Sequence, residues 1–93
     1  MLNSKYQKEL VRILTLIKDS DLMEEFLNDL LTPAEFEDLI DRWQIVKQLA
    51  RGTPQREIAK RLNVSVAKIT RGSLELRNKH GGFWKMLESI NKV

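Results

Sequence analysis

Apolar residues recur at intervals of three and four along the whole chain, and this period constrains the fold more than any other feature. Such spacing places side chains on one face of an α-helix. No stretch alternates apolar and polar residues for long enough to indicate a strand. We therefore expect an all-α chain of six short helices at about residues 4–18, 22–31, 33–50, 54–62, 66–78 and 83–90.

Two of these helices have recognisable start signals. Residues 32–35 read Thr-Pro-Ala-Glu, in which threonine caps the helix, proline suits its first position and glutamate closes a capping box. Thr53 and Pro54 repeat this chemistry, so we expect Thr53 to cap the fourth helix. Both starts follow from local chemistry and need no knowledge of tertiary contacts.

The ends of two helices are also marked. Arg51 and Gly52 indicate the end of the third helix, because basic residues suit a last turn and glycine accepts the left-handed conformation that follows. Asn63 tolerates that conformation as well, and Ser65 is able to cap the next helix. A tight turn is predicted at residues 63–65.

Composition excludes several classes of function. The 93 residues suffice for one domain, which we expect to span residues 1–93. The chain has no cysteine and a single histidine, His80, so thiolate and histidine metal sites and thiol catalysis are excluded. Neither a long apolar run nor a signal-peptide pattern is present, which predicts a soluble cytoplasmic protein. With no nucleophile–base pair and no glycine-rich phosphate loop, we expect neither an enzyme nor a bound cofactor.

Charge is divided sharply between the halves of the chain. Residues 1–41 hold four basic and ten acidic residues, a balance of −6, whereas residues 42–93 hold twelve basic and three acidic residues, a balance of +9. This asymmetry indicates that the second half faces a polyanion, although a merely solvated basic surface would look the same.

Residues 55–72 show the spacing of a helix-turn-helix, in which two helices cross at roughly 90–120° through a short turn. The positions that must be buried are apolar or small: Ile58, Ala59, Leu62, Val64, Val66 and Ile69. The positions between them are polar or basic: Arg56, Lys60, Arg61, Ser65, Lys68, Thr70, Arg71 and Ser73. We interpret residues 54–78 as a DNA-binding helix-turn-helix; the alternative is an ordinary helical hairpin.

The groove geometry of DNA suggests a role for each exposed position. A helix fits the major groove, where each base pair shows a distinct pattern of donors and acceptors. The candidate DNA-binding residues are Arg56, Lys60, Ser65, Val66, Ala67, Lys68, Thr70 and Ser73. Among these, Ala67, Lys68 and Thr70 are expected to meet base edges. Phosphate contacts are assigned to Lys60, Arg61, Arg77 and Lys79.

Two features remain after the motif is assigned. Gly72 stands where such motifs usually bury an aliphatic side chain, and glycine inside a helix costs about 1 kcal/mol relative to alanine. The first three helices carry more apolar surface than a short monomer is able to cover. A homodimer would bury the surplus, with a compact monomeric bundle as the alternative.

The segment Q-R-E at residues 55–57, followed by I-T-R-G-S at residues 69–73, resembles the tryptophan repressor family, as does the Leu-Thr-Pro start of the third helix. This resemblance covers residues 22–90. It implies an all-helical, intertwined homodimer whose helix-turn-helix units read operator DNA and whose co-repressor is L-tryptophan.

The resemblance also implies a ligand pocket. Arg71 and Gly72 correspond to residues that line it, with the glycine leaving room for the ligand. Arg42 corresponds to an arginine of the other subunit that stacks on the indole, and Thr32 to the threonine that holds the carboxylate. Glu75 replaces a serine near the ligand's amino group, which departs from the family pattern and puts tryptophan itself in question.

We therefore expect a ligand-responsive transcriptional repressor. Two other classes stay open at this point. One is a constitutive helix-turn-helix regulator with no effector or a different one. The other is a helical adaptor that binds protein through its acidic second and third helices; steep salt dependence would distinguish DNA binding from it.

Overall fold

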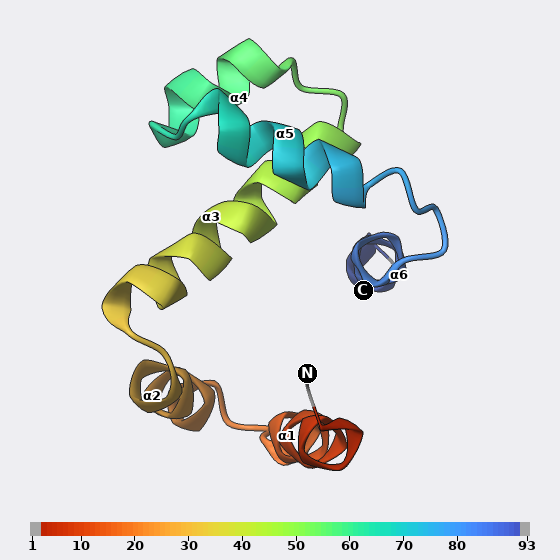
Figure 1. The fold of residues 1–93 in the computed structure, drawn as a ribbon. Coiled ribbons are helices and arrows are strands. Elements are labelled where there is room, and N and C mark those ends of the chain that lie inside the picture. The colour runs from red at the N-terminus through yellow and green to blue at the C-terminus, as the bar shows by residue number, and fades with distance from the viewer. Residues whose placement is uncertain (1–2, 92–93) are drawn as a thin grey trace. The chain divides into compact units, whose positions relative to one another are not determined.

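The computed structural model describes residues 3–91, which form helices and no strand. The six helices are α1 (Ser4–Leu16), α2 (Ser20–Leu30), α3 (Pro33–Ala50), α4 (Gln55–Leu62), α5 (Val66–Glu75) and α6 (Gly82–Asn91), labelled in Figure 1. The all-α prediction is therefore confirmed. The chain divides into two compact units, one ending at Phe36 and the other beginning at Glu37. The single domain over residues 1–93 stays a prediction, and its ends at residues 1–2 and 92–93 lie outside the described residues.

The first unit holds α1, α2 and the first turn of α3. Side chains cap both complete helices: the Asn3 Oδ1 atom accepts from the Lys5 N–H at 2.9 Å, and the Asp19 Oδ1 atom accepts from the Asp21 N–H at 3.0 Å. Neither helix contains a buried residue, although both present apolar stripes. The two helices are therefore defined by local chemistry, and their apolar surface is left exposed in the single chain.

The predicted capping box at the start of α3 is confirmed. The Glu35 N–H donates to the Thr32 hydroxyl oxygen at 3.2 Å, and the Thr32 N–H donates to the Glu35 Oε1 atom at 2.8 Å. Two backbone donors that the helix itself leaves unpaired are satisfied in this way. The Thr32 backbone N–H and, to a smaller extent, the Thr32 side chain hold the pKa of Glu35 below its ordinary value.

The second unit is organised around the C-terminal half of α3. Ile45 packs with Ile58 of α4 and Ile69 of α5, and its neighbour Val46 packs with Leu76 and Leu87. Successive helical residues point about 100° apart, so adjacent positions of α3 serve two clusters on different sides. Each fully buried isoleucine contributes about 1.5–3 kcal/mol relative to an exposed one. These contacts hold α4 and α5 across α3, as Figure 1 shows.

The turn between α4 and α5 has the predicted chemistry. Asn63 adopts the left-handed conformation, with φ of 53°, and Ser65 caps α5 by accepting the Lys68 N–H at 3.3 Å. Gly52 likewise has a positive φ of 87° after the last turn of α3. The helix-turn-helix is thus formed, and these local signals position its second helix.

Several predicted boundaries are wrong: α1 ends at Leu16 and not near residue 18, α2 begins at Ser20 and not near residue 22, and both α4 and α5 differ at one end. The N-cap of α4 is Pro54 and not Thr53, because Pro54 is still extended and no side chain caps the helix. The Pro54 carbonyl accepts from the N–H groups of Glu57 and Ile58, while the Thr53 N–H donates back to Gln48. Helix α5 ends at Glu75, three residues before its predicted end at residue 78. Leu76 follows as the C-cap, and its carbonyl accepts the indole N–H of Trp84 of α6 at 2.8 Å.

Candidate nucleic-acid interface

The outward face of α4 and α5 carries the candidate DNA-binding residues. Ile58 and Ile69 point inward and are completely buried, as the motif requires. Seven of the eight candidates are exposed, and the eighth, Ser73, is half-buried; the exposed ones are Arg56, Lys60, Ser65, Val66, Ala67, Lys68 and Thr70. The sequence motif had assigned Val66 to the core, which is wrong, because its side chain is 60% exposed. An exposed valine at the start of the helix is available to a thymine methyl group.

The first turn of α5 is suited to contact with a groove. Ser65, Val66 and Ala67 are small or short, so they allow close approach of a base edge. One turn later, the Thr70 hydroxyl donates to the Val66 carbonyl at 3.0 Å. That bond fixes the hydroxyl orientation and leaves the oxygen free to accept a hydrogen bond from a base. The face therefore offers an ordered acceptor beside apolar contacts.

Not every predicted phosphate contact is equally available. Arg61 forms an ion pair with Glu57 one turn earlier in α4, and the Lys79 ammonium lies over the Trp84 ring, 4.4 Å from its centroid. Lys60 and Arg77 are exposed. Exposed ion pairs on one helix are weak, so Arg61 is able to exchange Glu57 for a phosphate.

Lys68 forms contacts that the sequence did not indicate. Its ammonium lies 2.9 Å from the Asp38 Oδ1 atom and 3.5 Å from the Asp41 Oδ2 atom, both on α3. The hydrogen bond to Asp38 raises the pKa of Lys68, and the same bond lowers the pKa of Asp38. Both shifts favour the charged forms, so the pair is ionised at neutral pH. A residue expected to read bases is thus paired within the protein.

A cavity of about 210 Å³ lies beside this ion pair and is lined by Asp38, Arg42, Ile45, Lys68 and Arg71. Asp38, Arg42 and Ile45 belong to one face of α3, which α5 crosses. The resemblance implied that Arg42 comes from the second subunit. Within the single chain, Arg42 and Arg71 line one cavity, where this face of α3 and helix α5 pack together; a contribution from a second subunit stays a prediction.

Gly72 has a different surrounding from the one expected. It is buried, and a Cβ atom added there would lie 3.0 Å from the Ile45 Cγ2 atom and 3.7 Å from atoms of Leu49 and Val46. Side chains of α3 therefore lie close to the position of the missing side chain. Glycine favours the close crossing of α5 and α3, which accounts for the break in the apolar pattern; a role for Gly72 in ligand binding stays a prediction.

The remaining two candidate ligand residues lie elsewhere. Glu75 lines a separate cavity of about 450 Å³ together with Trp43, Gly82, Phe83 and Met86. Thr32 belongs to the first unit, where its hydroxyl oxygen serves the capping box. Its O–H group remains able to donate to a carboxylate. Roles for both residues in ligand binding stay predictions.

Replacing Thr32 with alanine is expected to lower the free energy of unfolding by about 0.5–2 kcal/mol, because an N-cap is lost. Urea denaturation measures this change, and Thr32→Ser serves as the control because it keeps the hydroxyl. The pKa of Glu35, followed by NMR titration, should return only in part towards its ordinary value in Thr32→Ala, because the backbone N–H of residue 32, the largest cause of the lowering, is kept. Unchanged stability together with an unchanged Glu35 titration would contradict the structural role of Thr32.

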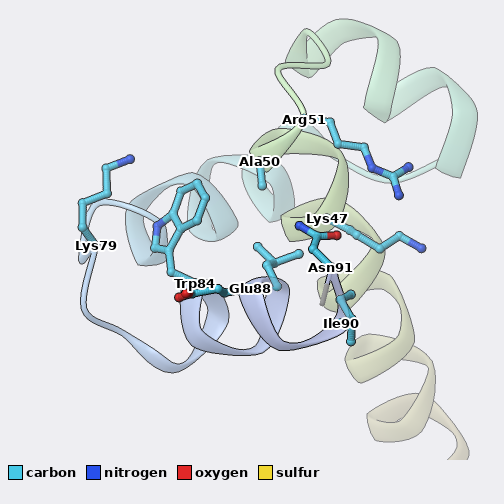
Figure 2. Close-up of a pocket in the computed structure, with 9 residues that line it drawn as sticks. Lys47, Ala50, Arg51, Lys79, Trp84, Glu88, Ile90 and Asn91 are labelled. Carbon is cyan, nitrogen blue, oxygen red and sulfur yellow. The ribbon is translucent and has the colours of Figure 1, made fainter. Parts of the chain in front are cut away.

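A further cavity, of about 470 Å³, lies between the end of α3 and α6 and was not anticipated from the sequence (Figure 2). Its lining combines basic and apolar side chains: Lys47, Ala50, Arg51, Lys79, Trp84, Leu87, Glu88, Ile90 and Asn91. The basic residues come from the chain's positive half, but their gathering here depends on α6 packing against α3. Sequence spacing alone offers no signal for it.

Within residues 3–91, no group of three or more acidic or histidine side chains is arranged to hold a metal ion. Within the same residues, no helix is long and apolar enough to cross a membrane.

Comparisons with known proteins agree with this geometry. The family model described as Trp repressor protein matches residues 5–91. A Trp operon repressor homolog of Xylella fastidiosa (strain M23) is 43% identical over 70 residues, covering 74% of this chain and 76% of the relative. One of Vibrio parahaemolyticus is 40% identical over 73 residues, covering 77% of this chain and 71% of the relative. No solved structure gives a significant match.

Proposed function

The chain belongs to the Trp repressor family, a family of transcriptional repressors, and we propose that it is a homodimeric, sequence-specific DNA-binding repressor with L-tryptophan as its co-repressor. The observation that carries the proposal is the exposed first turn of α5. It stands on a rigid isoleucine core, presents small residues and an oriented Thr70 hydroxyl, and is flanked by basic side chains. The protein then acts by binding rather than by catalysis, in the cytoplasm where the DNA is.

Base reading and backbone positioning fall to different residues in this proposal. Thr70 and the exposed apolar pair Val66 and Ala67 lie where α5 would enter the major groove. Arg56 and Lys60 of α4 are placed to contact phosphates, which supply affinity without reading sequence. Ser65 and Ser73 lie beside the base-contacting residues of α5 and are assigned to the polar edge of the DNA interface.

The DNA-binding half of the proposal is tested with two variants. A preferred duplex is first selected from a random pool, and affinity is measured by fluorescence anisotropy. Thr70→Ala should weaken binding to the selected duplex by about 1–3 kcal/mol and relax the preference at particular bases. Lys60→Ala should weaken all duplexes alike and reduce the salt slope by about one. If both variants behave identically on selected and random duplexes, the division of roles is wrong.

The ligand half of the proposal rests on the cavity between α3 and α5. Arg42 and Arg71 both line it, and guanidinium groups stack on aromatic faces and pair with carboxylates. An amino acid with an indole side chain has both an aromatic face and a carboxylate. Calorimetry with L-tryptophan, with and without the selected DNA, is the direct test. Binding to the protein–DNA complex should be tighter by the same factor by which tryptophan tightens DNA binding.

A homodimer is proposed for the apolar stripes of the first unit. Neither α1 nor α2 buries a residue in the single chain, and Tyr6 and Leu16 are 67% and 69% exposed. Exposed apolar surface of this extent marks a contact with another chain. The two helix-turn-helix units of the dimer, related by a two-fold axis, would then bind two half-sites on DNA.

One observation favours a second candidate, a helix-turn-helix regulator with a different effector or none. The cavity of about 210 Å³ is smaller than the roughly 300–1,000 Å³ of ordinary ligand pockets, and Ile45 occupies the space beside Gly72. Selective DNA binding with no calorimetric response to millimolar L-tryptophan would support this candidate over the first.

A further inference from the structure

Lys68 combines a position on the DNA-binding face of α5 with ion pairs to α3. It stands in the first turn of α5, on the face assigned to DNA, and its ammonium is bound to Asp38 and Asp41 of α3. The side chain is 46% exposed, so water and other partners reach it. An ammonium paired with two carboxylates must leave both of them before it contacts a phosphate or a base, and the two carboxylates also repel an approaching phosphate.

The same side chain is a wall of the cavity. Lys68 and Asp38 line it together with Arg42 and Arg71, so three cations and one carboxylate surround the space above Ile45. The cavity is small for a ligand with Lys68 in this position. Movement of Lys68 away from α3 would both enlarge the space and expose the Asp38 carboxylate within it.

We propose that the Asp38–Lys68–Asp41 ion pairs form a latch that withholds Lys68 from DNA, and that a zwitterionic ligand opens it by placing its own ammonium group at Asp38. The carboxylate of such a ligand pairs with Arg71 or Arg42. The ligand then exchanges one ammonium for another at Asp38, and its carboxylate offsets one of the two guanidinium charges in the cavity. Freed Lys68 joins the DNA-binding face, so this inference rests on the proposed function and adds its regulation.

The energies of exposed ion pairs make such an exchange feasible. Exposed ion pairs are weak, so the latch holds Lys68 without trapping it. A ligand shifts such an equilibrium only through its different affinity for the two states. The two states here are the closed latch, in which Lys68 is paired with Asp38, and the open latch, in which Lys68 is released. Only the open latch leaves Asp38 able to contact the ligand.

The first experiment needs no ligand. The variant with Asp38→Asn and Asp41→Asn should bind DNA roughly two- to thirtyfold more tightly than the unaltered protein, from the loss of two exposed pairs. Glu37→Gln is the matched control, since it removes one carboxylate from the same exposed helix without touching the latch. Removal of negative charge alone would raise affinity in any background, so the same changes are made in Lys68→Ala. The latch predicts that the gain disappears there; an equal gain with and without Lys68 overturns it.

The second experiment is independent of DNA. The Lys68 side chain is followed by NMR through its Cε and Nζ resonances. The pKa of Lys68 should fall towards its ordinary value in Asp38→Asn, and an unchanged pKa overturns the latch. L-tryptophan should shift the Lys68 resonances in the same direction as Asp38→Asn, whereas indole-3-propionate, which lacks the ammonium group, should not.

The outcomes separate this inference from the function on which it rests. Tryptophan that binds by calorimetry but leaves the Lys68 resonances unmoved overturns the exchange and leaves the co-repressor intact. Equal shifts from both indole compounds also overturn it. A protein that binds no DNA in any variant contradicts the proposed function, while the NMR titration still decides whether the pairs hold Lys68.

Discussion

Gly72→Val is expected to lower the free energy of unfolding of the second unit by about 1–3 kcal/mol, the usual cost of an overpacked core. A Cβ atom at this position already lies 3.0 Å from the Ile45 Cγ2 atom, which is tighter than ordinary van der Waals contact. The two additional methyl groups of valine extend further into the crossing of α5 with α3. Ile45 is itself 1% exposed and packed against Ile58 and Ile69, so it has little room to move.

Urea denaturation followed by circular dichroism measures the effect of Gly72→Val. Gly82→Val is the matched control, because nothing lies within 4 Å of a Cβ atom added there. Ile45→Ala removes the Cγ2 atom that clashes, so Gly72→Val should cost less in that background, and a double-mutant cycle reports the difference. If Gly72→Val is fully stable and only a ligand response is lost, the glycine serves the ligand and not the helix crossing.

The second large effect is expected from protein concentration. In an obligate dimer, a hundredfold increase in concentration stabilises the folded state by about 2.7 kcal/mol. For an assembly of two such chains this corresponds to a rise in Tm of roughly 5–10 °C. The physical reason is the exposed apolar surface of α1 and α2, which contain no buried residue in the single chain. Calorimetric scans across a concentration series measure the shift directly.

A pair of charge substitutions locates the contact. Tyr6→Glu places a charge on the apolar stripe of α1 and should lower Tm and favour dissociation, because Tyr6 is 67% exposed only as long as no partner covers it. Lys8→Glu changes an exposed residue of the same helix that is not part of the apolar stripe, and is the control. A folded monomer at micromolar concentration in sedimentation, with a Tm independent of concentration, would contradict the dimer.

Local signals in the sequence were sufficient for most helix boundaries and for the turn of the motif. The capping box of Thr32 and Glu35, the left-handed Asn63 and the Ser65 cap all form as predicted. Each depends on atoms within three or four residues, where the covalent geometry of the chain limits the possible partners. The N-cap at Pro54 was missed because it depends on a contact between residues further apart in the sequence. The Thr53 N–H donates to Gln48 on the preceding helix, a contact created by the Gly52 turn.

The candidate site was predictable only in part. The helix-turn-helix pattern was enough to separate buried Ile58 and Ile69 from exposed Lys60 and Thr70, since a 3.6-residue period decides which face of a helix is covered. Val66 was assigned to the wrong face because its spacing from Ile69 matches an inward position. Its side chain is nevertheless 60% exposed and is not part of the cluster around Ile69.

Contacts between distant segments were decided by the tertiary structure alone. Lys68 and Asp38 are 30 residues apart in the chain, and nothing in their spacing indicates that they meet. The same holds for Ile45 against Gly72, whereas the pairing of Arg42 with Arg71 in one pocket was expected from the family resemblance and not from spacing. Sequence period determines which face of each helix is apolar, but the crossing of α5 over α3 determines which polar residues at the rim of those faces come together. That crossing depends on how closely the backbones approach, and here the absence of a side chain at Gly72 allows it.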